Sequence, residues 1–184
     1  TIDLTKTSYP SSIARIYKKF GTAEIKPDKD IIAGTVATWE YSFTVGTHGI
    51  KEGGGLKFTL HHSTDWEAFQ LDNPEGSGYV SVEVSGDVKF ISKLTRHDAC
   101  VFVHVIITEG KLNKGDKINI NVGDTRGGAS GSRSQTFEQK EFSFYTLVDA
   151  TGYGHYFQQP KPPQVSILGG EAKKIQVVAP SVVT

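Results

Sequence analysis

Apolar and polar residues alternate along several short stretches of the chain. The alternation is clearest in residues 39–45, 56–60, 80–84 and 117–122, where every second residue is apolar. A period of two places one set of side chains in a core and the other in water, as in an antiparallel strand. The pattern therefore predicts a strand with one buried face in each of these four ranges.

Other stretches add to the predicted strands. Residues 101–107 are apolar on both faces, which indicates a central strand. Residues 137–148 predict one longer strand, and residues 165–168 and 175–179 predict two more near the end of the chain. Eight or more short strands joined by glycine-rich turns are typical of a β-sandwich or a barrel.

One stretch near the start of the chain has helical spacing instead. Its apolar residues fall at i, i+3, i+4 and i+7 between Ser12 and Gly21, which predicts a short helix. We therefore predict an all-β fold, a predominantly antiparallel β-sandwich of immunoglobulin-like or jelly-roll-like type, as a single domain over residues 22–184. An N-terminal extension carrying the short helix precedes it over residues 1–21.

Composition narrows the classes of function. The chain of 184 residues has 20 basic and 20 acidic side chains, and this balance argues against nucleic acid as a partner. The sequence contains no run of 18 apolar residues that would indicate a membrane span. The given residues also contain no signal-peptide pattern, and the sequence does not identify the cellular compartment. The sequence has no methionine, so we expect that Thr1 is not a translation start and that the chain is either processed or part of a larger protein.

Two long stretches lack strand patterning, and such loops often carry function. The first, residues 61–78, contains Asp65, Trp66 and Phe69. Trp66 and Phe69 form a candidate aromatic platform for a sugar ring. The alternative is that Trp66 covers the open end of the core.

The second long loop, residues 123–136, is rich in glycine and contains Arg126 and Arg133. It lacks the Gly-Lys-Ser/Thr ending and the following helix of a phosphate-binding loop. The planar guanidinium groups fit carboxylates. We expect one or both arginines to pair with an internal carboxylate, such as Asp124 or Asp65, and to fix the loop to the sandwich; the alternative is a role in ligand binding.

Metal chemistry has little support in the sequence. Adjacent His61 and His62 would point to opposite faces of a strand, and His104 lies in the apolar stretch, where we expect a core histidine. No Cys/His cluster or HExxH motif is present. We therefore predict no metal site, no cofactor and no catalytic residue in this chain.

Four short motifs together carry a resemblance to a known family. The motifs are Thr44-Val-Gly-Thr-His-Gly-Ile50 with Gly53-Gly-Gly55, Ser63-Thr-Asp-Trp66, Leu112-Asn-Lys-Gly-Asp-Lys-Ile118 with Gly123-Asp124, and Arg126-Gly-Gly128 with Arg133-Ser-Gln-Thr-Phe137. Their order and spacing along residues 20–180 resemble the N-terminal β-rich segment of a large, mostly bacterial family of unknown function. Full-length members of that family resemble metal-dependent hydrolases of the polymerase-and-histidinol-phosphatase (PHP) type.

The resemblance implies where the chemistry of the family lies. Its metal ligands belong to a downstream domain that opens with Asp-Leu-His, a segment that this chain lacks. The resemblance therefore implies a fragment that acts as a non-catalytic accessory module, with the downstream domains of the same parent chain as its partners. The alternative is a stand-alone binding module, with carbohydrate as the ligand and Trp66, Phe69 and the Arg126–Arg133 loop as its site. The third reading is an independent hydrolase, for which no nucleophile–base set is visible.

Overall fold

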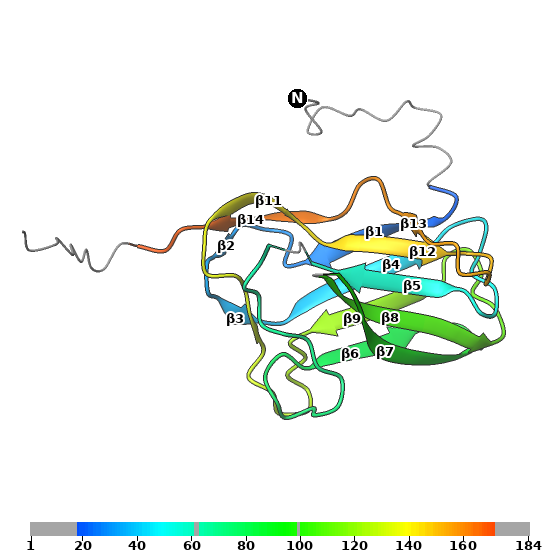
Figure 1. Ribbon diagram of the computed structural model, residues 1–184, viewed down its shortest axis with the longest axis horizontal. Helices are drawn as coiled ribbons and strands as arrows, with labels where there is room; N and C mark the ends of the chain where they lie inside the picture. Colours follow the sequence, from blue (N-terminus) through cyan, green and yellow to red (C-terminus); the bar gives the residue numbers. More distant parts are fainter. Residues whose placement is uncertain (1–17, 61–62, 99, 172–184) are drawn as a thin grey trace, which may run out of the picture.

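The computed structural model describes residues 18–60, 63–98 and 100–171 and shows two antiparallel sheets packed face to face (Figure 1). The first sheet has four strands in the order β1-β4-β9-β6. They are β1 (Gly21–Lys26), β4 (Trp39–Val45), β9 (Lys117–Val122) and β6 (Val80–Val84). The second sheet has five strands in the order β13-β12-β5-β8-β7. They are β13 (Phe157–Gln158), β12 (Tyr145–Asp149), β5 (Gly55–Thr59), β8 (Cys100–Glu109) and β7 (Lys89–His97).

Two smaller sheets lie at one end of the sandwich (Figure 1). One contains β11 (Gln139–Ser143), β14 (Gln164–Leu168) and β2 (Ile31–Ile32), with a parallel pairing between β14 and β2. The other pairs β10 (Ser132–Arg133) with β3 (Val36–Ala37). The all-β, mainly antiparallel sandwich predicted from the alternation is thereby confirmed.

The core forms between the two large sheets from the apolar side of each alternation. Tyr41 on β4 and Phe58 on β5 contact each other across the interface, with ring centroids 4.8 Å apart. The buried Tyr41 hydroxyl bonds to the Thr146 hydroxyl on β12, so its polar atom is satisfied. Trp39, Phe43, Ile118 and Ile120 from the first sheet, with Leu56, Val103, Val105 and Ile107 from the second, are also buried.

The structure corrects the prediction of one long strand over 137–148. β11 and β12 are separate strands on either side of the buried Phe144; β11 pairs with β14, whereas β12 pairs with β5. A register shift within β11 and the positive φ of Glu141 (56°) turn the backbone there. A bulge of this kind re-aims a strand without a change in its apolar pattern.

Two other predictions concern the ends of the chain. Of the predicted N-terminal helix, the structure describes only residues 18–20, which form a turn, and the rest lies outside the described residues. The strand predicted over 175–179 also lies outside them. The division into an extension over 1–21 and a domain over 22–184 stays a prediction. No helix in the described ranges is long and apolar enough to cross a membrane.

Candidate functional site

A polar groove lies on the outer face of the first sheet. Its cavity volume is about 450 Å³, and it crosses all four strands. The groove is built by the polar half of each alternation, because residues that flank the core positions on a strand point to the opposite face. Glu24, Glu40, Ser42, Glu83, Lys117, Asn119, Asn121 and Arg126 are among its lining residues.

Strand register arranges the lining residues in two rows across the sheet. The first row runs Glu24–Ser42–Asn119–Glu83, with a hydrogen bond of 2.8 Å from the Ser42 hydroxyl to the Asn119 side-chain oxygen. The second row runs Lys26–Glu40–Asn121–Ser81. In it, the Asn121 side-chain amide donates to the Ser81 hydroxyl over 3.2 Å.

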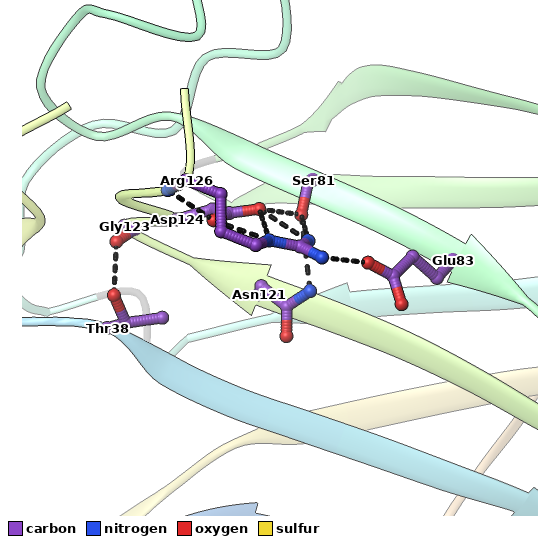
Figure 2. Close-up of polar contacts among 7 residues, drawn as sticks. All are labelled: Thr38, Ser81, Glu83, Asn121, Gly123, Asp124 and Arg126. Atoms are coloured by element: carbon purple, nitrogen blue, oxygen red, sulfur yellow. Dashed lines mark hydrogen bonds and ion pairs between the residues drawn. The ribbon is translucent and has the colours of Figure 1, made fainter. Parts of the chain in front are cut away.

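The segment that follows β9 forms one wall of the groove. It turns at Gly123, whose φ of 73° favours glycine, and a Cβ at this position would lie 2.3 Å from the Ser132 nitrogen. The Thr38 hydroxyl donates to the Gly123 carbonyl over 2.6 Å and holds the turn against the sheet (Figure 2). The turn thus delivers Asp124 and Arg126 to the sheet surface.

The Arg126 guanidinium lies over β6 and bonds to three side chains (Figure 2). Its Nε is 3.0 Å from Asp124 Oδ1, and its Nη2 is 2.7 Å from Asp124 Oδ2. Nη1 is 2.6 Å from Glu83 Oε1, and Nη2 is 3.1 Å from the Ser81 hydroxyl. These contacts hold a long side chain, itself 63% exposed, in one position.

The same contacts set the charge state of Asp124. Its carboxylate is buried and accepts hydrogen bonds from the Arg126 side chain, the Ser81 hydroxyl and the Arg126 backbone N–H. The Arg126 hydrogen bonds hold the pKa of Asp124 well below its usual range, against the opposing effect of burial. Asp124 is therefore ionised at neutral pH and balances one charge of the groove.

Four charged side chains in the groove have no partner in the described part of the chain. They make no side-chain hydrogen bond or ion pair there, although each lies beside a polar residue of the next strand. They are Glu24, Lys26, Glu40 and Lys117. The groove therefore offers two carboxylates and two ammonium groups to whatever occupies it.

Among the residues singled out in the sequence, Trp66 lies in the core. It is 7% exposed, packs edge-on against Trp39 with ring centroids 4.7 Å apart, and stacks on Phe142 at 5.1 Å. Its indole N–H donates to the Ser132 hydroxyl over 3.2 Å. This is the placement of the structural alternative, in which Trp66 closes the open end of the core, and it leaves no exposed platform at this residue.

Phe69 and Trp66 line a second, smaller cavity of about 190 Å³. Phe69 is partly buried and packs against Phe58, with ring centroids 6.0 Å apart. Its ring therefore contributes to the core as well as to the cavity.

Arg133 and Asp65 lie together, as the pairing interpretation predicts. Arg133 Nη1 is 3.7 Å from Asp65 Oδ2, and Nη2 donates to the Asp65 carbonyl over 3.2 Å. Asp65 also accepts bonds from the Thr136 hydroxyl and N–H at 2.5 and 2.8 Å, which lower its pKa. Arg126 pairs with Asp124, the other predicted carboxylate, so the two arginines do not form one site.

The prediction for His104 needs a correction, because its side chain lies on the outer face of the second sheet. Its Nε2 is 2.6 Å from the Tyr156 hydroxyl, and Lys57 and Lys93 flank it in register on β5 and β7. Burial first, and then the two lysine charges, lower the pKa of His104 to about 4. The apolar outer positions of β8 explain the error, because they made both faces of this strand look buried.

The groove as a set of residues was missed by the sequence analysis. Its polar positions were visible in the alternation, but the strand order that places them side by side was not. Metal binding gains no support from the described residues, which contain no group of three or more His, Cys, Asp or Glu side chains placed to hold an ion.

Comparisons with known proteins place the chain only coarsely. No family model matches it. It is 28% identical over 159 residues to an uncharacterized protein of Chlamydia pneumoniae, in a match that covers 82% of this chain and 25% of that protein. The chain thus spans about a quarter of the length of this curated relative. The relative is bacterial, as the motif resemblance implies, and the link to PHP-type hydrolases stays a prediction.

A comparison of structures finds a weak similarity. The chain resembles AvmM, which catalyses macrocyclization in alchivemycin A biosynthesis, with a TM-score of 0.35 and 10% sequence identity. The match covers 83% of this chain and 85% of that chain. A similarity at this level carries no argument about function.

Proposed function

We propose that this chain is a non-catalytic accessory module of a longer protein and that it binds a polar ligand in the groove of sheet β1-β4-β9-β6. The observation that carries the proposal is the groove itself: a cavity of about 450 Å³ whose charged side chains are partly fixed and partly unpaired. A concave site with a few fixed polar groups is a common form of ligand site.

The accessory role is supported by the share of the relative that the chain matches. One quarter of the Chlamydia protein corresponds to this chain, so the remainder is long enough for further domains of ordinary size. The motif resemblance suggests a PHP-type metal-dependent hydrolase as the parent, with its metal ligands downstream. In this proposal, the module packs against those domains and helps to present their substrate.

Nuclear magnetic resonance (NMR) mapping tests the groove. The labelled 184-residue protein is titrated at millimolar concentration with a panel of neutral, acidic and basic oligosaccharides and with short acidic and basic peptides. We expect saturable shift changes confined to Ser42, Asn119, Asn121 and their neighbours for at least one member. Shift changes from none of the probes, or changes confined to the second sheet, would contradict the binding role.

Two further measurements test the accessory, non-catalytic role. The gene sequence that follows the codon for Thr184 should encode further domains, and a stop codon there would contradict the module proposal. An esterase and phosphatase screen of the 184-residue protein should show no turnover. Turnover that disappears when a groove residue is replaced would instead establish an enzyme.

A further inference from the structure

We infer that the ligand of the groove is a neutral, hydroxyl-rich chain of the carbohydrate class, an inference that rests on the binding role proposed above. The groove has no exposed aromatic platform among its lining residues, and its one tyrosine, Tyr41, is buried in the core. Recognition there must therefore come from hydrogen bonds. The charges of the groove and its hydrogen-bonding groups each restrict the chemical class of the ligand further.

The charges of the groove leave no large excess of either sign. Its lining contains four carboxylates and three basic groups. Arg126 is paired with both Asp124 and Glu83, so its positive charge is not free for an anionic ligand, and this set of three side chains carries one net negative charge. The remaining two carboxylates and two lysines cancel each other. A strongly charged ligand would meet attraction from one of these sets and repulsion from the other, so its charge gains little, whereas a neutral ligand needs no such gain.

The free hydrogen-bonding groups suit hydroxyls. A hydroxyl both donates and accepts, so it can bond to a carboxylate and an ammonium group at once. Glu40 lies beside Lys26 in one row, and Glu24 lies beside Ser42 in the other. The Asn119 side-chain amide also has N–H donors that are free within the described part of the chain, because its hydrogen bond with Ser42 uses its oxygen.

The spacing of these groups favours an extended ligand over a compact one. Neighbouring strands lie about 4.8 Å apart, and the two rows are two residues apart along each strand, which is about 7 Å. The groups thus form an array along the groove that crosses four strands, with donors and acceptors in both directions. A chain of sugar rings carries hydroxyls repeatedly along its length and can bond to several members of this array.

Titration with matched oligosaccharides tests the inference. The 184-residue protein is titrated with neutral trisaccharides (maltotriose, cellotriose, mannotriose and chitotriose), with acidic trigalacturonate and with trilysine, and groove shifts are followed by NMR. We expect saturable binding of at least one neutral sugar. Glu40→Ala should weaken that binding roughly tenfold or more, as expected for a lost hydrogen bond to a charged group, and Asn119→Ala should weaken it by up to about tenfold, as expected for a neutral amide.

The controls separate failure of the inference from failure of the proposed function. The control is Glu109→Gln. Glu109 lies on β8 of the second sheet, away from the groove on the outer face of the first sheet, so this variant should bind the sugar with unchanged affinity. Melting temperatures show whether each variant is folded. Groove binding of only the acidic sugar or only trilysine would overturn the inference and keep the binding role. Absence of groove binding by every probe would overturn both.

Discussion

Arg126 donates two hydrogen bonds to the carboxylate of Asp124, two residues before it, with Nε 3.0 Å from Oδ1 and Nη2 2.7 Å from Oδ2. The same guanidinium reaches Glu83 on β6, so a turn after β9 is tied to the strand beside it. The pairing converts a glycine-rich loop into a fixed wall of the groove. Arg126 thus positions the site, although its charge is not free for a ligand.

Replacing Arg126 by alanine should therefore destabilise the protein. The change leaves the buried Asp124 carboxylate with the Ser81 hydroxyl and a backbone N–H as its remaining partners. Because Arg126 is largely exposed and screened by solvent, we expect a loss of only about 1–2 kcal/mol in the free energy of unfolding, measured by urea denaturation. Arg126→Lys should recover little of it, since an ammonium group does not form the two-point contact. A full recovery by lysine would contradict the geometric argument.

The pairing of Arg126 with Asp124 and of Arg133 with Asp65 could be predicted from the sequence, but the groove could not. Asp124 lies two residues before Arg126 in the sequence, and a guanidinium forms favourable hydrogen bonds with a carboxylate. Both partners of this pair were therefore visible in the sequence. Glu83 becomes a partner only because β6 pairs with β9, and strand pairing between distant segments has no local signal. The two rows of the groove depend on the same pairings.

The errors in the predicted strands have the same physical origin. Phe142 and Phe144 continue the alternation across residues 137–148, so the sequence shows no break. The break lies at Phe144, three residues after the positive φ of Glu141, where the chain leaves the sheet of β11 for the sheet of β12. Trp66 illustrates a related limit: a tryptophan in a polar loop looks exposed, and only the packing of Trp39 and Phe142 shows that it is not.

Trp66→Ala should unfold the protein at much lower denaturant concentrations. Loss of a buried tryptophan costs roughly 3–5 kcal/mol, because the cavity it leaves is only partly filled. The packing partners Trp39, Phe142 and Phe144 would all lose contacts. Urea denaturation measures the change, with Trp66→Phe as the milder comparison. A Trp66→Ala protein of unchanged stability would mean that the ring does not close the core.

Arg133→Ala should also destabilise the domain, but by less. Both side chains of the Arg133–Asp65 pair are about two-fifths exposed and their charged atoms are 3.7 Å apart, so we expect a loss below about 1 kcal/mol. Asp65→Ala should lower the stability more than Arg133→Ala, since it also removes the carboxylate that accepts two hydrogen bonds from Thr136. Thermal melting of both variants measures the order. An unchanged melting temperature for Arg133→Ala would count against its role in fixing the loop.

Stability should fall steeply below about pH 4. The pKa of Asp124 is lowered by Arg126, and that of Asp65 by Thr136. At Asp149, burial opposes the hydrogen bonds from Thr151, Gly154 and Gly152, but the bonds together lower the pKa. A carboxylate with a folded pKa below its unfolded value of about 3.9 stabilises the protein above that pH and loses this effect as the pH falls.

Urea denaturation between pH 2 and 7 measures this dependence. Asp124→Asn should be less stable at neutral pH and should show a shallower loss of stability between pH 4 and 2. A profile as steep as that of the original protein would show that Asp124 does not contribute to the acid dependence.

His104 should stay neutral at pH 6 and titrate near pH 4, as NMR of its ring protons can show. Burial lowers its pKa first, followed by the charges of Lys57 and Lys93, so Lys93→Met should raise the pKa toward the unfolded value of about 6.5. Lys89→Met on the same strand is the control, because Lys89 is paired with Glu109 and does not face His104.

Between about pH 6.5 and 4 the unfolded chain binds a proton at His104 that the folded protein does not, so His104 lowers the stability of the protein as the pH falls across this range. A His104 that titrates at 6.5 in the original protein would show that its ring is not shielded by Tyr156 and the second sheet.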